Sequence, residues 1–484
     1  MKNKMLRTAI VVLLFGFYAG FLMHKVNLVT ADLGRHIRNG EFLFQDAKVL
    51  STNFYSYTQP GYPDINHHWG SGLIFYLLEQ AGGITSVHLF FIILSLGAFA
   101  LFFFTAVKQS SLAWASLAAL PMIFLLGERT EIRPEVFSYF FAGLFLWLLY
   151  KFRAARRHYK LLFFLPVLEV LWANTHIYFI LGPMIAGAFL LEALITKREN
   201  ARRLLIIFIL TVLATLLNPA FIKGAVEPLI ILRAFGYRLA ENQTVLFMLK
   251  LSVNPALRIF IAVFALMVLS FIPALHKLRK NYPLVNIFLF AGFSFLAWFQ
   301  IRNIAFFAFV ALPILAFNLK AVFGEARETS LFKISGSFLA VILVIALSGN
   351  LFHYFPYWYQ FGLGTEPANN TAAEFFKRQK IQGPIFNNYD IGGYLIYHLF
   401  SQTRVFVDNR PEAYSVDFFQ KEYIPMQQDE AVWKTQNEKY KFNAIVFSHR
   451  DATPWGQAFL SQRVKDPQWS TVFLDQYVII LVRK

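Results

Sequence analysis

The sequence predicts a polytopic α-helical membrane protein that carries a small α/β domain at its C-terminal end. Hydrophobic residues make up 57% of the 484 residues and charged residues only 15%, and the mean hydropathy is +0.49. Apolar runs long enough to span a bilayer recur up to about residue 349, after which the composition becomes polar. We therefore expect a transmembrane domain over residues 1–349 and a separate domain over residues 350–484.

Charge and cysteine content narrow the class of partner. The formal net charge of +17 would suggest nucleic acid in a soluble protein, but here the basic residues cluster between apolar runs. That distribution is typical of membrane orientation, so we expect membrane lipid and no nucleic acid as a partner. The chain has 0 cysteines, which excludes a disulfide framework, a thiol nucleophile and a cysteine metal site.

The transmembrane domain is predicted to contain about eleven spans. The first follows Lys2, Lys4 and Arg7 and lacks a small-residue cleavage site, so we expect a retained helix and not a signal peptide. The expected spans are 5–23, 84–107, 111–126, 135–150, 161–174, 177–195, 204–217, 257–274, 284–300, 303–318 and 334–349.

The basic connections predict the orientation. Segments 151–160, 196–203 and 276–280 are rich in Lys and Arg and fall on one side of the membrane, whereas the intervening connections hold far fewer. Because basic loops favour the cytoplasm, we expect a cytoplasmic N-terminus. An odd number of spans then places the C-terminal domain outside the cytoplasm, as a small α/β domain. Its expected strands are 383–386, 404–408, 443–448, 470–475 and 476–482, with a helix over 371–380.

Candidate chemistry begins in the first outer loop, 24–83, which opens with TADLGRHIRNGEFL. We expect a helix over 31–45 with Thr30 as its N-cap, which places Asp32 and His36 on one face. In one interpretation this is an interfacial helix in which Asp32 pairs with Arg35 or His36. In the other, Asp32 lies at the mouth of a membrane cavity and is a general base. Arg35 and Arg38 are predicted to be interface anchors.

The second outer loop, GERTEIRPE (127–135), alternates acids and arginines. It is either a solvated turn or a site in which Arg129 or Arg133 contacts phosphate and Glu128 or Glu131 is a second acid. Arg302 and Asn303 interrupt two apolar runs with almost no loop between them, so Arg302 must point into a polar cavity or snorkel outward.

The histidines also leave alternatives open. His176 is equally a satisfied helix-end histidine or a substrate contact. His67 and His68 are adjacent and make a poor metal pair, so interfacial residues beside Trp69 are the simpler interpretation. A metal could combine Asp32, His36 and an acid from another loop, but the spacing shows no such site.

Two motifs of the C-terminal domain carry similar pairs of interpretations. NNYDIGGYLIYHL (387–399) offers a helix start that could hold an anion, and VDNRPEAY (407–414) ends a strand with Asp408 and Arg410. Turn chemistry and an internal salt bridge are the simpler interpretation of both.

These motifs together resemble the GT-C superfamily of glycosyltransferases. The resemblance rests on the layout of one span, a long loop opening with ADLGRHIRNGE and continuing through 49–83, many further spans, and a tail with GGYLIYHL and RVFVDNRPEAY. Bacterial members similar to dolichyl-phosphate-mannose–protein mannosyltransferases are the nearest group.

The resemblance implies a bacterial cytoplasmic-membrane enzyme. Such an enzyme transfers a sugar from a polyprenyl-phosphate donor to an envelope acceptor on the outer face, with inversion. It implies catalytic roles for Asp32, with His36 beside it, and for Glu128 or Glu131. It also implies basic contacts to the lipid phosphate, for which Arg129, Arg133 and Arg302 match by location. His176 and Asn303 lie on the same outer face and are further candidate substrate contacts. A divalent metal is a candidate cofactor, but relatives often carry two neighbouring acids where this chain has Ala31 and Asp32, so the metal ligands stay unknown.

Two other functional classes fit parts of the sequence. A transporter or lipid flippase would place ionisable residues at mid-span, where this chain has little besides Glu169 and Glu192. A non-catalytic scaffold could use the same fold.

Overall fold

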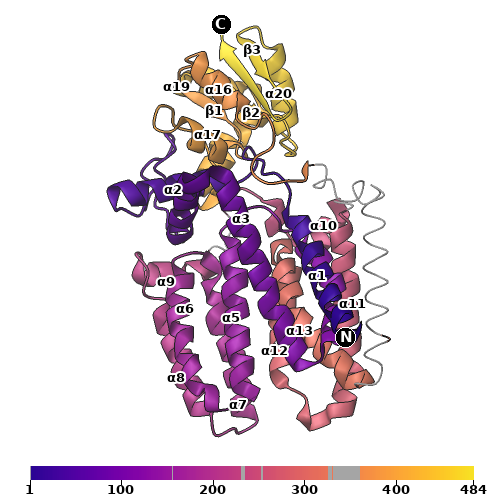
Figure 1. Ribbon diagram of the computed structural model, residues 1–484. Coiled ribbons are helices and arrows are strands. Elements are labelled where there is room, and N and C mark those ends of the chain that lie inside the picture. The colour runs from indigo at the N-terminus through magenta and orange to yellow at the C-terminus, as the bar shows by residue number, and fades with distance from the viewer. Residues whose placement is uncertain (1, 155, 231–234, 252–253, 325–329, 331–359) are drawn as a thin grey trace.

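The computed structural model describes residues 2–154, 156–230, 235–251, 254–324, 330 and 360–484. It has two parts, a bundle of long helices and a smaller α/β domain at one end of it (Figure 1). Helix α2 (Leu33–Asp46) lies between the two parts. The N-terminus and the connection between the helices labelled α7 and α8 lie toward the opposite end of the bundle from the α/β domain.

Within the described residues, the bundle helices overlap every predicted span except 334–349, which lies outside those residues. They are α1 (Lys2–Leu22), α3 (Trp69–Gln109), α4 (Leu112–Leu126), α5 (Glu135–Ala154), α6 (Phe164–Ala173), α7 (Leu181–Ile195), α8 (Ala201–Ala214), α11 (Pro255–Leu278), α12 (Leu284–Phe299) and α13 (Ile304–Phe323). In the described part of the chain, 6 helices are long and apolar enough to cross a membrane. The others, such as α6 with 10 residues, are shorter than a full span.

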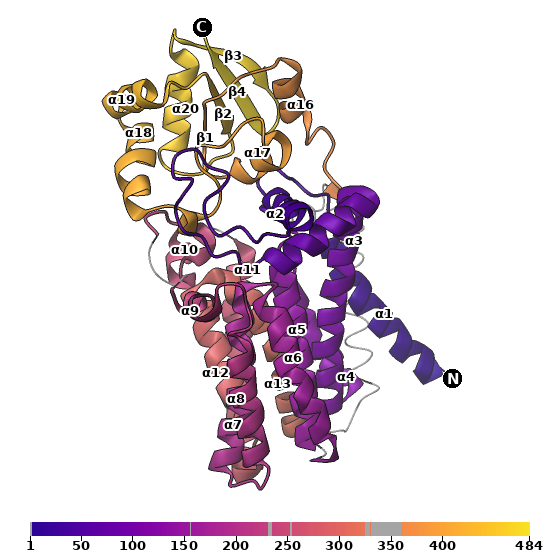
Figure 2. The ribbon, with the colours of Figure 1, turned by 90° about the vertical axis from the view of Figure 1, so that its left-hand side faces the viewer.

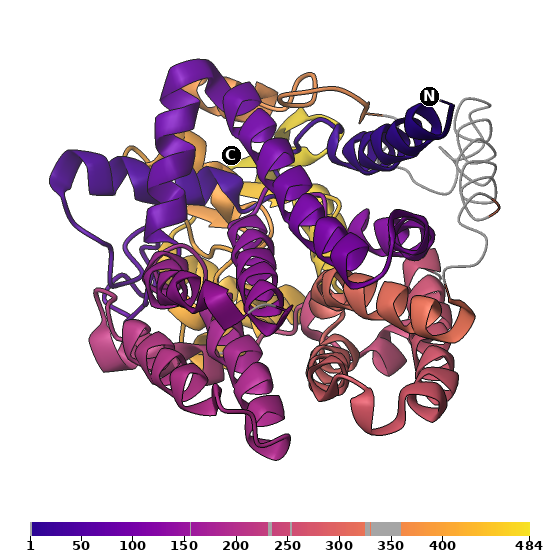
Figure 3. The ribbon, with the colours of Figure 1, turned by 60° about the horizontal axis from the view of Figure 1, so that its bottom comes forward.

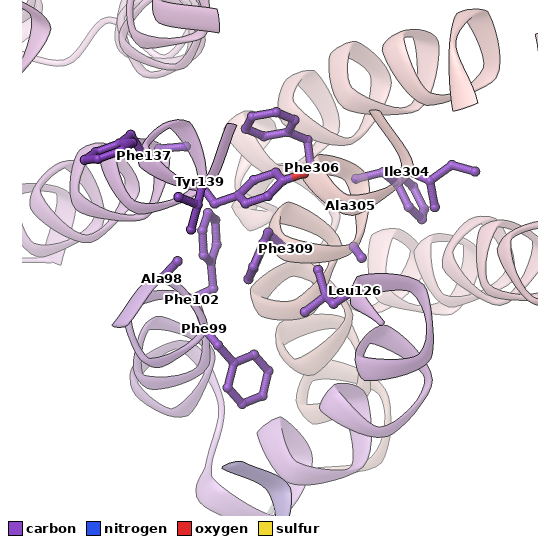
Figure 4. Packing of buried hydrophobic residues seen from close by; sticks show 14 of the residues in the cluster. Ala98, Phe99, Phe102, Leu126, Phe137, Tyr139, Ile304, Ala305, Phe306 and Phe309 are labelled. Carbon is purple, nitrogen blue, oxygen red and sulfur yellow. The ribbon is translucent and has the colours of Figure 1, made fainter. Parts of the chain in front are cut away.

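Aromatic side chains form the centre of the bundle (Figure 4). Phe102 of α3 stacks on Phe309 of α13 with ring centroids 4.9 Å apart. Tyr139 of α5 contacts Phe306 at 4.7 Å and Phe309 at 5.1 Å. Such ring pairs add about 0.5–1.5 kcal/mol beyond the area they bury. Helix α13 is therefore held in place by helices from distant parts of the sequence, and Arg302 and Asn303 lie immediately before its start.

The predicted limit of the first loop at residue 83 coincides with a kink in α3, and the residues before the kink are already helical. Helix α3 begins at Trp69 and is kinked at Gly82 and Gly83, where Gly83 has a φ of 67°. The part before the kink packs on α2, and a Cβ atom at Gly40 would lie 2.1 Å from the carbonyl oxygen of Gly72. The two helices approach this closely because both positions lack a side chain.

The α/β domain contains a 4-stranded sheet in the order β1-β2-β4-β3. Strand β1 (Ile385–Asn387) is parallel to β2 (Ala444–Ser448), whereas β4 (Val478–Arg483) is antiparallel to β2 and to β3 (Trp469–Leu474). The surrounding helices are α16 (Thr371–Arg378), α17 (Gly392–Leu399), α18 (Pro425–Gln428), α19 (Glu430–Tyr440) and α20 (Gly456–Lys465).

One predicted strand, 404–408, is wrong. This segment does not join the sheet; it pairs with the first loop, where Val405 forms a bridge with Ser56. The backbone N–H of Tyr57 donates to the Val405 carbonyl at 3.2 Å, and the N–H of Val405 donates to the Tyr55 carbonyl at 3.2 Å. The apolar run is thus used to attach the α/β domain to the bundle.

The remaining short helices lie near this junction. They are α9 (Phe221–Ile230) and α10 (Val245–Leu251), and both lie at the end of the bundle that faces the α/β domain (Figure 2). Figure 3 views the bundle from its other end, with the α/β domain behind the helices. The side chains that could carry chemistry gather at the junction.

Candidate functional site

Asp32 lies at the junction, immediately before α2. Thr30 is not the N-cap, because the helix begins at Leu33 and Asp32 occupies the capping position without a side-chain capping hydrogen bond. Instead, Asn409 of the α/β domain donates a short hydrogen bond from its Nδ2 to Asp32 Oδ1. The Asn409 Oδ1 accepts from Arg35 Nε at 3.3 Å. The amide therefore links the acid and the arginine, and Arg35 is buried here, not an interface anchor.

Glycines allow this approach of the two domains. A Cβ atom at Gly34 would lie 2.6 Å from the Cβ of Tyr397, and one at Gly393 would lie 3.1 Å from the Asn409 amide. Helices α2 and α17 can therefore touch along their backbones. Arg38 also faces α17, because its Nε donates to the Tyr397 carbonyl at 2.9 Å. The expected anion site at the start of α17 is filled by protein, since a Cβ at Gly392 would lie 2.4 Å from the Asp408 Cα.

Arg410 links the α/β domain to the first loop through ion pairs. Its guanidinium pairs with Asp408 at 2.7 Å and with Asp64 of the first loop at 2.6 Å, and it donates to Asn53 Oδ1 at 2.9 Å. The side chains of Arg410 and Asp408 are 4% and 0% exposed. The internal salt bridge predicted for VDNRPEAY is confirmed, and it extends to the first loop. Burial alone would raise the pKa of Asp408, but Arg410 outweighs it and the pKa is lowered.

A cavity of about 670 Å³ opens beside Asp32 and reaches from the junction into the bundle. Its polar end is lined by Asp32, Arg35, His36, His68, Arg133, Glu135, His176, Tyr178, Glu241, Asn242, Arg302, Asn303, Asn409 and Glu412. The rest is an apolar lane lined by Ile180, Leu181, Met184, Phe208, Leu229, Phe295 and Phe299. Leu229, Phe295 and Phe299 are 62%, 66% and 44% exposed, so the lane reaches the apolar surface of the bundle.

An acid surrounded by arginines forms one wall of the polar end. Glu241 pairs with Arg133 at 2.8 Å, with Arg129 at 3.0 Å and with Arg302 at 3.5 Å. Burial would raise the pKa of Glu241, but these arginines hold it well below its ordinary value. Arg302 also lies over the ring of Tyr178 at 5.3 Å and donates to Asn242 Oδ1 at 3.2 Å. Arg302 therefore points into the polar cavity, which was one of its two predicted orientations.

Three imidazoles also line the polar end of the cavity. The His36 and His68 rings are 5.1 Å apart, and the His68 and His176 rings are 5.2 Å apart. Burial, with Arg35 nearby, holds the pKa of His36 and of His68 well below the ordinary value, so both are neutral at pH 7. The Ser138 hydroxyl lies 2.7 Å from His176 Nδ1 and fixes that ring. These rings offer neutral hydrogen-bonding groups to the cavity.

The predicted site residues divide between two cavities. Asp32, His36, Arg133, His176, Arg302 and Asn303 line the large one. Glu128, Arg129 and Glu131 line a smaller cavity of about 200 Å³ behind the arginine wall. Glu128 accepts from Asn254 Nδ2 at 3.1 Å, and Glu131 pairs with Arg133 at 2.7 Å. Glu128 and Glu131 therefore do not line the cavity that contains Asp32, and Arg133 and Glu241 line both cavities.

Some residues of the site carry no local signal in the sequence. Glu241 was not predicted, because it lies far in the sequence from the motifs that it meets in space. Asn409 and Glu412 lie within VDNRPEAY, where Asp408 and Arg410 were singled out instead. His68 was interpreted as an interfacial residue, yet its ring lies between those of His36 and His176. Arg35 could have been found, since a charged residue close to Leu33 and Ile37 on an apolar stripe must be paired if the helix is buried.

The residues do not fit a divalent metal. In the part of the chain that the structure describes, no group of three or more acidic, histidine or cysteine side chains is placed to hold an ion. Asp32 is hydrogen-bonded to an amide and Glu241 is paired with arginines. The predicted combination of Asp32, His36 and another acid is thus not formed among these residues.

The sequence matches no family model and no curated protein. Solved structures share the fold. The archaeal oligosaccharyltransferase AglB from Archaeoglobus fulgidus, in complex with an inhibitory peptide and a dolichol-phosphate, has a TM-score of 0.61 at 12% identity, over 92% of this chain and 70% of that one. The fold is that of the GT-C glycosyltransferases. The predicted resemblance is confirmed at the level of fold.

Two further structures extend the comparison. A crystal structure of the Archaeoglobus fulgidus enzyme tethered with an acceptor peptide containing the NVT sequon has a TM-score of 0.61 at 13% identity, over 99% of this chain and 74% of that one. The arabinofuranosyltransferase AftD from Mycobacteria has a TM-score of 0.51 at 14% identity, over 100% of this chain and 40% of that one. This chain therefore shares its fold with glycosyltransferases that are longer than itself.

Proposed function

We propose that the protein is a membrane glycosyltransferase that moves a sugar from a polyprenyl-phosphate donor to an envelope acceptor, with inversion. The observation that carries the proposal is the two-part cavity: an arginine-lined polar end containing a carboxylate, continuous with an apolar lane open to the bundle surface. The GT-C fold supports it, because the structural neighbours include glycosyltransferases and one of them was solved with a dolichol-phosphate.

The two parts of the cavity match the two parts of such a donor. A polyprenyl chain needs an apolar surface that is accessible from the membrane, and the lane past Met184, Phe295 and Phe299 supplies one. The phosphate needs cationic hydrogen-bond donors, and guanidinium groups match its oxygens. Arg302 and Arg133 face the cavity at the start of that lane. They would stabilise the phosphate as its bond to the sugar breaks.

Asp32 is the proposed general base. The acceptor oxygen would attack the anomeric carbon, the bond from that carbon to the phosphate oxygen would break with its electrons leaving on the phosphate, and the acceptor proton would pass to Asp32. Burial raises the pKa of Asp32, against the effect of Arg133 and Arg35, and a raised pKa improves a carboxylate as a base near neutrality. Asn409 holds the carboxylate in position.

The other predicted residues take supporting roles in this proposal. His36 and His176 offer neutral imidazoles to the bound sugar, and Asn303 lines the cavity beside Arg302. Arg129, Glu128 and Glu131 lie behind the arginine wall, where they would set the position of Arg133 and Glu241. We place the protein in a bacterial cytoplasmic membrane with the N-terminus in the cytoplasm and the site on the outer face, as the basic loops predict.

The test is transfer by the purified full chain in proteoliposomes, with undecaprenyl-phosphate-linked hexose and pentose donors and masses of both products. Asp32→Asn should lower the rate of transfer by about 10²- to 10⁴-fold, as expected for loss of a general base. Asp46→Asn, at the exposed end of the same helix, is the matched control and should leave the rate unchanged. A wild-type rate of sugar transfer by Asp32→Asn would refute the proposal. A transporter would instead move the lipid-linked substrate across sealed vesicles without forming a glycosidic product.

A further inference from the structure

A third cavity, here called the side cavity, adjoins the large one and is lined in part by the α/β domain. It has a volume of about 160 Å³ and shares Arg35, His68, Ile177 and Glu412 with the large cavity. Unlike the large cavity, it has no apolar lane. Its wall comes from the first loop, including Asp64 and His67, and from the α/β domain through Arg410 and Glu412. It therefore meets the large cavity at its polar end, where Arg35, His68 and Glu412 line both.

Two groups that line this side cavity have hydrogen-bonding capacity left for a ligand. His67 is 4% exposed, and its Nε2 has no hydrogen-bond partner among the described residues. Glu412 is partly buried and makes no ion pair with another described side chain, although Arg410 is two positions away. Arg410 is already committed to Asp408 and Asp64. Buried polar groups normally have partners, so the unpartnered Nε2 of His67 is placed to contact a ligand. The carboxylate of Glu412 has a backbone hydrogen bond, and its two oxygens can accept further ones.

The hydrogen-bond donors and acceptors that line the side cavity indicate the class of ligand that it suits. Arg35 offers donors, Asn66 offers both donors and acceptors, and Asp64 and Glu412 offer acceptors. This mixture suits the hydroxyl groups of a carbohydrate, which both donate and accept. A peptide would more readily add to a sheet edge, but no strand of the four-stranded sheet lines the cavity.

We propose that the side cavity is the acceptor subsite and binds a carbohydrate acceptor between His67 and Glu412, so that one hydroxyl faces Asp32. The proposal rests on the proposed function and adds the class of acceptor to it. Donor and acceptor then enter from different directions: the donor through the apolar lane and the acceptor from the water-exposed side of the junction. Glu412 is a binding residue in this arrangement, and the α/β domain supplies it.

Charged groups on several elements act on Glu412. Asp64 of the first loop opposes its ionisation, and Arg35 of α2 and Arg410 favour it. His67 and His68, together with Glu227 of α9, also line the cavity. Burial, followed by Asp64, raises the pKa of Glu412 to about 7. Because an ionised carboxylate accepts stronger hydrogen bonds from hydroxyls than a protonated one, the acceptor KM should fall as the pH rises through 7.

The experiment uses the full chain in proteoliposomes with an undecaprenyl-phosphate-linked sugar and, as acceptor probe, an α-linked mannose hexasaccharide. Glu412→Gln and His67→Gln should each raise the acceptor KM by about 10- to 100-fold and leave the donor KM within about twofold of wild type. Glu412→Gln should also abolish the change of acceptor KM around pH 7. Asp417→Asn, an exposed acid on the same segment, is the control. An unchanged donor KM in each variant shows that the fold is intact.

Several outcomes would overturn the subsite while leaving the glycosyltransferase in place. These are wild-type acceptor KM values in both variants, or transfer to a Ser- and Thr-containing peptide but not to the hexasaccharide. If wild type transfers no sugar from any lipid-linked donor, the proposed function fails. The subsite is then tested by equilibrium dialysis of the hexasaccharide, for which equal binding to wild type and Glu412→Gln would refute it.

Discussion

Two ion clusters at the junction have opposite compositions. In one, Arg410 lies between two acids, Asp408 and Asp64. In the other, Glu241 lies among three arginines. The side chain of Arg410 is 4% exposed, whereas that of Glu241 is 23% exposed and lines the cavity.

The two clusters use the same acid–arginine ion pairs, but their different exposure suits one to a structural role and the other to ligand binding. A fully buried arginine between two acids has all its charge compensated by protein, and losing it leaves buried anions unpaired. An acid among arginines at a cavity wall leaves guanidinium groups beside a space that a ligand can enter, since Arg133 and Arg302 both line the large cavity. We therefore expect changes in the first cluster to act on stability and changes in the second to act on donor binding.

The largest effect should come from Arg410→Met. This change leaves Asp408 and Asp64 buried without a cation, which is expected to lower stability by about 3–5 kcal/mol. The measurement is the melting temperature of the detergent-solubilised full chain. Arg404→Met, an exposed site six positions away, should change stability by no more than about 0.5 kcal/mol. Equal melting temperatures for the two variants would show that the Arg410 cluster has no structural role.

The pH dependence of that cluster has a defined sign. Because the pKa of Asp408 is lowered in the folded protein, its stabilising contribution is present above the ordinary pKa of an aspartate. The contribution is lost as the pH falls through the lowered value. Acidification should therefore lower the melting temperature of wild type more than that of Arg410→Met.

Arg302→Met should have a smaller effect, and on a different quantity. Loss of a charged hydrogen-bond donor to phosphate is expected to raise the donor KM by about 10- to 100-fold, with little change in melting temperature. Arg238→Met, an exposed arginine in the segment before Glu241, serves as the control. If Arg302→Met lowered stability and left the donor KM unchanged, the two clusters would not differ in role.

Gly34→Ala tests whether the contact between the domains positions Asp32. The added Cβ would lie 2.6 Å from that of Tyr397, so α2 and α17 must separate, at about 1–3 kcal/mol. The rate of transfer should fall because Asn409 then lies farther from Asp32, while the donor KM changes little. Gly20→Ala in α1 is a matched control, because nothing lies within 4 Å of its added Cβ. Unchanged transfer in Gly34→Ala would show that the contact does not set the position of Asp32.

Local patterns predicted some of these residues well. Apolar runs located the bundle helices, and Arg302 was identified because it interrupts two of them. The partners of these residues were beyond reach, since they depend on which segments meet in three dimensions. Asn409 is 377 positions from Asp32, and Glu241 is 108 positions from Arg133. The segment 404–408 shows the same limit, because its β-like run pairs with the first loop and not with the sheet.

The pairing of Glu241 with arginines determines how donor binding should depend on ionic strength. Arginines that are already neutralised by Glu241, Glu135 and Glu131 produce only a weak electric field at a distance. Phosphate dissolved in the surrounding water is therefore hardly attracted to them. A lipid-bound phosphate does not need that attraction, since it diffuses in the plane of the membrane and exchanges with the carboxylate only on arrival. The rate of donor binding should accordingly vary little with salt concentration, and soluble anions should bind only weakly to the site.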